Sequence, residues 1–428
     1  MIKIENTLSY NKTRQDLLSG KITSIWASDF YFNGIRSFPI LPFRYITSNF
    51  SDFEKNLIAD NKMVYHLSGY GTSYDEALVS YLGESAERYT FAVFSQLVSE
   101  RIIKASYLNL VGEFGRSNVC SLDYVNTYHD ESSPEYVGDS DEIYWIRMNS
   151  LINLGRDVYL PLQHVVSGSN RVYPEAKNYS NAAVSTGSAS HETIQQALNN
   201  ALIECLQIDS FELWWYGGIE GDPIQLDISM YLSKIFGSVS AKEFLENFKV
   251  SFRDISFDKG IPIVICEIIS QVEMLPQYTV GVQGGTDYNS VIYRSLMEAL
   301  SVLEYNMGLP WMDLEKWEGI KRNTTSITNF DDNVIFYAKY GKPPRKVSRS
   351  AFGSNANNSR PLDAVRKLSK YAGFLVITLP EFEDLNLEVV RVSIPELLTL
   401  SLPSFPPRLH PRFNSCGGIS NNVPHPLA

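Results

Sequence analysis

The sequence predicts an α+β protein built from repeated strand–turn–helix units. Its 428 residues could form several folding units at about 100 to 200 residues per domain. Hydrophobic residues make up 44% and charged residues 20%, which is typical of a globular protein with a large core. A similar segment also occurs three times, each with a β-prone approach, a glycine-containing turn and a helix. The repeat decides the predicted class.

The chain divides into an N-terminal segment and a main domain. Residues 1–58 are mixed, rich in aromatics and asparagine, and carry no motif. The strand–turn–helix pattern begins soon afterwards, so residues 59–428 are taken as one domain. Its last part, residues 399–428, contains too many prolines for a helix or a central strand. We therefore expect an extended tail over the surface.

Each repeat helix carries an acidic residue about four turns in. The offset from the turn glycine to this acid is 15 positions in the first copy and 17 in the other two. We predict that the three acids lie at similar heights on similar helices and converge on one cavity. The copies begin at His66, Val184 and Thr279, and their glycine–acid pairs are Gly69 and Glu84, Gly187 and Glu204, and Gly281 and Glu298.

Further polar residues share a helical face with these acids. In an α-helix, positions three and four apart are neighbours. The surrounding positions are mostly apolar, and burying an isolated carboxylate is costly unless it is paired or coordinated. Several such acids together therefore indicate a cation. The grouped residues are Ser80, Glu84, Glu87 and Arg88 in the first copy, and Asn200, Glu204 and Gln207 in the second.

Oxygen ligands without histidine or cysteine suit a hard divalent ion, and Mg²⁺ with few protein ligands is usually accompanied by phosphate oxygens. The pattern thus predicts nucleotide-bound Mg²⁺. A simpler interpretation also stays open, in which these are solvated helix faces and Arg88 pairs within its own helix. Neither a Walker loop nor a G-x-G-x-x-G turn occurs, so a nucleotide site would be built from acids and helices. The predicted metal ligands are Glu84, Glu87, Glu204, Gln207 and Glu298.

Charge and composition exclude several functions. The net charge of −11 makes duplex nucleic acid a poor partner. No stretch approaches the 18 apolar residues of a membrane span, and the N-terminus lacks a signal-peptide pattern. Four scattered cysteines without a CxxC pair indicate reduced thiols. We expect a cytoplasmic protein that binds neither nucleic acid nor membrane.

These motifs resemble the YcaO family. The first family motif, S-x3-E-x2-E-R, is matched by residues 80–88, and the second by residues 200–207. The third places a Gln or Arg after its Glu; Glu298 fits, but Ser301 and Val302 stand at the partner's place, and Arg294 one turn earlier could substitute. The resemblance covers about residues 60–428 and assigns nucleotide contacts to Ser80, Glu84, Glu87, Arg88, Asn200, Glu204, Gln207, Arg294 and Glu298.

The end of the chain resembles the azoline-forming members. VVRVSIPEL at residues 389–397 is similar to a late family strand that ends in Pro-Gly, with Glu396 in place of the glycine. Family chains of this type close on Pro-x-Pro-x-Pro; here Pro424 and Pro426 match and Ala428 replaces the last proline. The resemblance implies that the tail approaches the substrate, with the Ala428 carboxylate as a base or positioning group.

The resemblance implies an ATP- and Mg²⁺-dependent cyclodehydratase. In such enzymes a Cys, Ser or Thr side chain of a ribosomal precursor peptide attacks the preceding carbonyl. ATP then phosphorylates the oxygen, and an azoline ring forms as phosphate leaves. Two alternatives stay open: a YcaO enzyme that makes a thioamide or macroamidine, and a catalytically silent scaffold.

The same resemblance implies partners. Residues 1–58 are too few for an E1-like leader-binding module, so a separate E1-like partner protein is expected. A flavin-dependent azoline dehydrogenase often belongs to such assemblies, but the sequence is silent on it. A homodimer is also compatible with the sequence.

Overall fold

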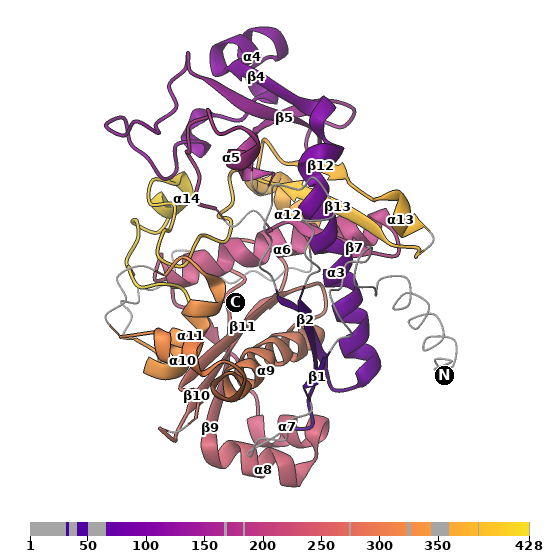
Figure 1. Ribbon diagram of the computed structural model, residues 1–428, viewed down its shortest axis with the longest axis vertical. Helices are drawn as coiled ribbons and strands as arrows, with labels where there is room; N and C mark the ends of the chain where they lie inside the picture. The colour runs from indigo at the N-terminus through magenta and orange to yellow at the C-terminus, as the bar shows by residue number, and fades with distance from the viewer. Residues whose placement is uncertain are drawn as a thin grey trace.

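A computed structural model describes residues 31–33, 41–49, 66–166, 169–182, 185–273, 275–322, 327–343, 359–383 and 385–427. Within these ranges helices and strands are mixed along the chain (Figure 1). The predicted α+β class with repeated strand–turn–helix units is confirmed.

The described strands form three sheets, ordered β1-β2-β3, β11-β10-β9-β8 and β4-β5-β12-β13-β7, with β6 paired to β5. The first sheet joins part of the N-terminal segment to the first repeat, because β2 pairs with β3. The strands are β1 (Tyr31–Asn33), β2 (Arg44–Asn49), β3 (His66–Gly71), β4 (Ile102–Ser106), β5 (Glu142–Ser150), β6 (Asp157–Pro161), β7 (Ser188–His191), β8 (Asp222–Pro223), β9 (Phe248–Asp254), β10 (Ile263–Ser270), β11 (Tyr278–Gly284), β12 (Gly373–Val376) and β13 (Glu388–Ser393).

Each repeat consists of a strand and the long helix that follows it: β3 with α3, β7 with α6, and β11 with α9. Ser73, Thr193 and Asp287 cap the three helices by accepting a backbone N–H one turn in. The helices are α3 (Tyr74–Leu97), α4 (Tyr107–Phe114), α5 (Ser169–Val172), α6 (Ile194–Trp215), α7 (Ile228–Phe236), α8 (Ser238–Asn247), α9 (Tyr288–Met312), α10 (Leu314–Gly319), α11 (Phe330–Tyr340), α12 (Pro361–Leu368), α13 (Pro380–Glu383) and α14 (Pro411–Asn414).

Helix α6 is the centre of the molecule. It contacts β7, β13 and β11, and thus both larger sheets. Figure 1 shows it crossing the middle of the view, with β13 above it, β7 level with it on the right and β11 below. Nearly every side chain of its C-terminal half, from Cys205 to Trp215, is buried. A helix segment buried all round cannot show a clean polar face, so the acids of this half, Asp209 and Glu212, lie inside the protein.

Glycine allows two of the repeat helices to approach their own strands closely. A Cβ atom added at Gly281 would lie 2.3 Å from the carbonyl oxygen of Ser295 and 2.4 Å from the backbone nitrogen of Ala299 in α9. At Gly69 it would lie 2.1 Å from the carbonyl oxygen of Ala77 in α3. Any side chain there would push the helix off its strand.

The expectation of an extended surface tail is wrong for the end of the chain. Asn421, His425 and Leu427 are buried, and the short helix α14 interrupts the segment. The backbone of the last described residues bonds to side chains of α6 and α11 instead of water; these bonds join Trp215 to Val423, Tyr337 to Pro424, and Asn333 to His425 and Leu427.

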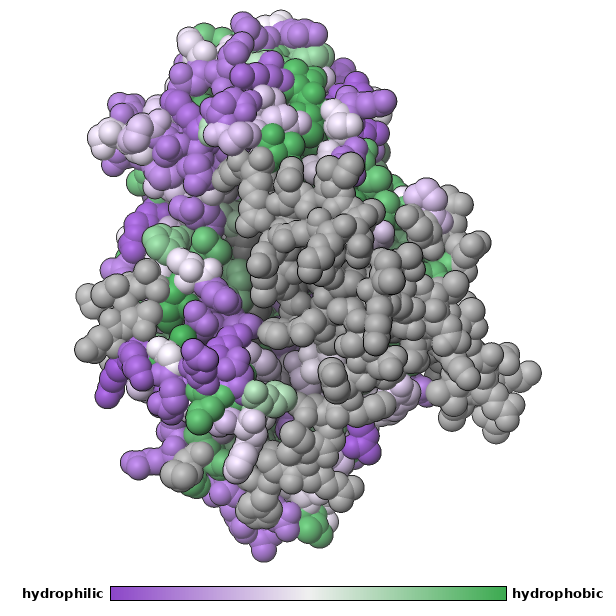
Figure 2. All heavy atoms as spheres, viewed as in Figure 1, coloured by the Kyte–Doolittle hydropathy of each residue, from purple (hydrophilic) through white to green (hydrophobic). Residues whose placement is uncertain are grey.

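The outer surface is polar at one end of the molecule. In Figure 2, hydrophilic residues cover much of the upper end, which β4 and α4 form. Among the described helices, none is long and apolar enough to cross a membrane.

We expect Gly281→Ala to lower the free energy of unfolding by about 1–3 kcal/mol, because the new methyl group meets helix backbone rather than a movable side chain. Urea denaturation would measure the change. Gly112→Ala is the matched control, since Gly112 lies exposed in α4 with nothing near its missing Cβ. It should be neutral or stabilising by up to about 1 kcal/mol. Equal effects of the two substitutions would contradict the packing argument.

Candidate active site

The three repeat acids are held in the same way. Glu84 Oε2 accepts the N–H of Ser68 at 2.8 Å, Glu204 Oε2 accepts that of Gly187 at 2.9 Å, and Glu298 Oε2 accepts that of Val282 at 2.8 Å. In each case the donor lies on or just before the strand of the same repeat. The near-equal sequence offsets therefore correspond to one hydrogen bond made three times. A carboxylate held through one oxygen can still bind a cation with the other.

The acids are half-buried and within electrostatic reach of one another. Desolvation raises the pKa of Glu87, and the neighbouring Glu204 and Glu84 raise it further. Desolvation likewise raises the pKa of Glu298 to about 7, with a contribution from Glu204. Carboxylates that repel each other in this way favour a cation among them.

Two arginines offset part of this negative charge. Arg88 Nε lies 3.6 Å from Glu84 Oε1 on the same helix, which is the intrahelical pair that the simpler interpretation expected. Arg88 also lowers the pKa of Glu87, and so does Arg391 from β13. Sequence reasoning did not single out Arg391, although it lies within the late strand that resembles the family.

Three predicted contact residues lie at the outer edge of the acids. Ser80, Asn200 and Arg294 are exposed, and each precedes a repeat acid by one helical turn. The three helices thus present the same order, an exposed polar residue followed by a half-buried carboxylate. Whether these side chains contact a nucleotide stays a prediction.

The Gln207 side chain makes hydrogen bonds to β11 that the sequence did not reveal. Its side-chain nitrogen donates to the carbonyl of Val282 at 2.8 Å, and its oxygen accepts the N–H of Gly284 at 2.8 Å. Both ends of the amide are thus bonded to β11, and the side chain is buried. Gln207 therefore ties the second repeat to the third, and its predicted role as a metal ligand stays untested.

The described residues contain no group of three or more His, Cys, Asp or Glu side chains that could hold a metal ion by itself. Glu204 influences both Glu87 and Glu298 electrostatically, but the described acids form no closed protein cage, and their convergence on one cavity stays a prediction. This arrangement fits Mg²⁺ that arrives with a nucleotide, because such ions take one or two carboxylates and complete their coordination with phosphate oxygens and water. The donor set is oxygen only, as Mg²⁺ prefers.

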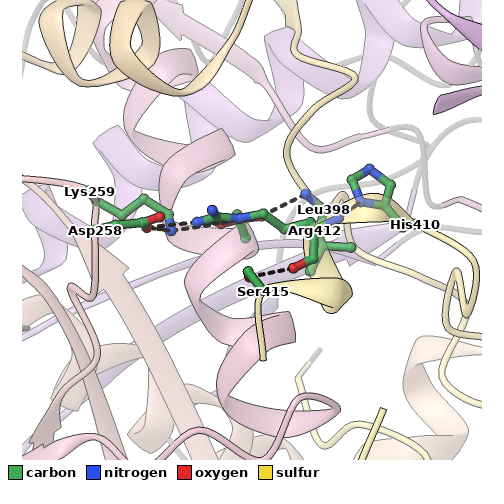
Figure 3. A network of polar contacts seen from close by, with 7 residues as sticks. Asp258, Lys259, Leu398, His410, Arg412 and Ser415 are labelled. Atoms are coloured by element: carbon green, nitrogen blue, oxygen red, sulfur yellow. Dashed lines mark hydrogen bonds and ion pairs between the residues drawn. The ribbon is translucent and has the colours of Figure 1, made fainter. Parts of the chain in front are cut away.

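The far end of α6 is joined to the C-terminal segment by buried ion pairs (Figure 3). Asp209 lies 2.7 Å from Lys259 Nζ and 2.9 Å from Arg412 Nη2, and it also accepts the N–H of Leu398. Asp258 bonds to both cations. Burial raises the pKa of Asp209, but Arg412 and Lys259 outweigh this and hold it below its usual value.

One turn further, Glu212 faces the tail. Its Oε1 accepts the backbone N–H of Ser401 at 3.1 Å, whereas Oε2 is buried without a hydrogen-bond partner among the described residues. Burial raises the pKa of Glu212 to about 8. The tail also reaches the second repeat acid, because the N–H of Leu400 donates to Thr186 Oγ1, next to the glycine that holds Glu204.

The predicted catalytic residues of the tail are only partly described. Pro424 is half-buried and its carbonyl accepts the Tyr337 hydroxyl of α11, and Pro426 is buried. Ala428, to which the carboxylate was assigned, lies outside the described residues.

A family model described as YcaO cyclodehydratase, ATP- and Mg²⁺-binding, matches residues 68–398. The chain belongs to the YcaO family. The matched range contains the second and third repeats, the first repeat except its first two residues, and the late strand β13. The prediction of ATP and Mg²⁺ as cofactors is thereby confirmed at the level of the family.

Solved structures share the fold. A heterocyclase in complex with substrate and cofactor has a TM-score of 0.61 at 17% identity, over 92% of this chain and 52% of that one. The chain therefore spans about half the length of that relative. The Escherichia coli microcin synthetase McbBCD complex gives 0.59 at 11% identity, over 89% and 90% of the two chains. YcaO from Methanopyrus kandleri, bound with AMPPCP and Mg²⁺, has a TM-score of 0.53 at 14% identity, over 92% of this chain and 91% of that one. No curated protein matches the sequence.

The Glu212 carboxyl should make stability depend on pH. Its pKa is about 8 in the folded state against a usual 4.5, so between these values the folded protein binds more protons and stability falls as pH rises. We expect Glu212→Gln to be more stable than wild type above pH 8, by an amount on the order of a few kcal/mol, and to differ little near pH 4.5. Urea denaturation of both proteins across this range would show it, and a difference that does not change with pH would contradict it.

Proposed function

We propose that this YcaO protein is an ATP-dependent cyclodehydratase that converts Cys, Ser or Thr residues of a ribosomal precursor peptide into thiazoline or oxazoline rings. The observation that carries the proposal is the set of three carboxylates held identically by Ser68, Gly187 and Val282. A site of oxygen ligands around a phosphate-bound Mg²⁺ is what phosphoryl transfer requires. The family model is described as ATP- and Mg²⁺-binding, which supports the same two cofactors.

In this proposal the acids hold Mg²⁺ on the phosphates, and the arginines offset their charge. Glu84, Glu204 and Glu298 are oriented before any ligand arrives, because each is already bonded to its strand. Such preorganised groups avoid reorganisation during the reaction. Bound ATP supplies the phosphoryl group that makes the peptide oxygen a leaving group, while the thiol or hydroxyl of the peptide provides the new ring bond.

We assign the tail to the peptide. It is packed between the C-terminal end of α6 and α11, and Leu400 bonds to Thr186 beside the Glu204 anchor. This contact would let a peptide held by the tail lie near the nucleotide. The Ala428 carboxylate, as base or positioning group, remains part of the proposal.

Partners are also proposed. Related structures include the multi-protein McbBCD complex and a heterocyclase with its substrate, which supports work on a peptide within an assembly. We propose a separate E1-like leader-binding protein, with a flavin-dependent azoline dehydrogenase as a further component. The four cysteines are free thiols, which supports a reducing, cytoplasmic setting.

The deciding experiment is mass spectrometry of a precursor peptide after incubation with this chain, its partner and ATP. A cyclodehydratase removes one water for each ring. A thioamide or macroamidine product would replace the proposal with the other YcaO chemistries. Absence of peptide-dependent ATP consumption, with the partner present, would indicate a scaffold.

Glu87→Ala and Arg88→Ala should each abolish ATP use while the protein stays folded, because they remove groups assigned to metal and phosphate. Losses of order 10²-fold or more are typical of such electrostatic groups. Phosphate release measures turnover, and circular dichroism checks the fold. Glu243→Ala, at an exposed position of α8, is the control and should retain full turnover. Equal turnover in all variants would refute the assignment.

Asn333→Ala should disturb the tail without disturbing the nucleotide site. Asn333 is fully buried and donates to the carbonyls of His425 and Leu427 at 2.7 Å each, so its loss removes one buried hydrogen bond from each carbonyl, at about 1 kcal/mol each. We expect ring formation to fall several-fold more than affinity for an ATP analogue. A variant that cyclises at the wild-type rate would separate the tail from catalysis.

A further inference from the structure

Arg391 is a buried cation between the two best-matched repeats. It lies on β13, and only 1% of its surface is exposed. Its guanidinium donates to the backbone carbonyls of Val165 at 3.2 Å, His164 at 3.1 Å and Thr186. Among the described residues these donors go to carbonyls and not to a carboxylate. A buried arginine without an ion pair is uncommon, and its position needs a reason.

The contact with Thr186 places Arg391 against the turn that holds Glu204. Gly187 follows Thr186, and its N–H donates to Glu204 Oε2 at 2.9 Å. The carbonyl of Gly187 accepts the N–H of Val392, the residue after Arg391, at 2.6 Å. Both peptide groups that flank the glycine are thus fixed by β13.

The turn has no freedom to adapt. Gly187 has φ of +91°, and a Cβ atom there would lie 2.4 Å from the carbonyl oxygen of Val392 and 3.2 Å from Arg391 Nη1. The backbone can pass here only without a side chain. Arg391 and the glycine therefore fit one another, and the direction of the Gly187 N–H depends on both.

Arg391 also lies next to the first repeat. Its guanidinium carbon is 5.6 Å from the centre of the Phe91 ring, one helical turn after Glu87 in α3. Its charge lowers the pKa of Glu87 and of Glu204, against the larger effect of burial. Burial lowers the pKa of Arg391 itself to about 10, so it stays positive at neutral pH.

We infer that Arg391 is a positioning residue for the nucleotide site: it fixes the Thr186–Gly187 turn that aims the Glu204 carboxylate. The inference rests on the proposed function, because it assigns Glu204 to the nucleotide-bound metal. Arg391 acts through Glu204 and does not itself need to touch the ligand.

The test is equilibrium binding of AMPPCP with Mg²⁺ by calorimetry. Arg391→Met should weaken binding about 10-fold or more, since residues that orient metal ligands typically contribute 10- to 100-fold to affinity. Because Arg391 acts through Glu204, the double variant Arg391→Met/Glu204→Gln should bind hardly more weakly than Glu204→Gln alone. A purely structural role would instead give additive losses.

Arg366→Met is the matched control. Arg366 is an exposed arginine of α12 that donates to the carbonyl of Leu151, and its loss should leave binding unchanged. If Arg391→Met does not fold, Arg391→Lys takes its place, with a smaller loss expected because the charge is kept while the forked donor geometry is not. Wild-type affinity in a folded Arg391 variant, or additive losses in the double variant, would overturn the inference. A wild-type protein that does not bind Mg²⁺–AMPPCP would overturn the proposed function itself.

Discussion

The bond from a strand N–H to a helix carboxylate is the constraint on which the rest of the site depends. It occurs in all three repeats, at Glu84, Glu204 and Glu298. A side chain of this length can reach backward to the strand only if helix and strand nearly touch. The absence of Cβ atoms at the repeat glycines permits this contact. The same bond stabilises the repeat and orients an oxygen donor, so packing and chemistry are not separable here.

Helix α6 carries one of the repeat acids and also holds the C-terminal segment. Its first half carries Glu204 and, through Gln207, bonds to β11 of the next repeat. Its second half carries Asp209 and Glu212, which hold the C-terminal segment through Arg412 and Ser401. Fully buried ion pairs such as Asp209 with Lys259 contribute little net stability but make any rearrangement costly. The repeat acids and the tail are therefore fixed relative to one rigid helix.

Several features were accessible from local pattern alone. The near-equal spacing of glycine and acid predicted equivalent acids, because a strand, a capped turn and about three helical turns have nearly constant dimensions. The apolar surroundings of Glu84 and Glu204 indicated a buried charge. The family motifs added ATP and Mg²⁺, which the family match supports. In contrast, the prediction of an extended tail over the surface was wrong for the end of the chain. Proline content limits secondary structure but says nothing about which surface a segment packs against.

By itself, then, the sequence determined the repeated strand–turn–helix class and the equivalent positions of Glu84, Glu204 and Glu298 along their helices. These follow from periodicity and turn chemistry within about thirty residues of chain. The tertiary structure alone decided that Gln207 bonds to β11, that the tail is buried against α6 and α11, and that Arg391 bonds to the turn that holds Glu204. Each of these contacts joins residues far apart in the chain, Gln207 with Gly284 and Arg391 with Thr186 among them. Such pairs form only where sheets and helices pack together, and no local spacing encodes them.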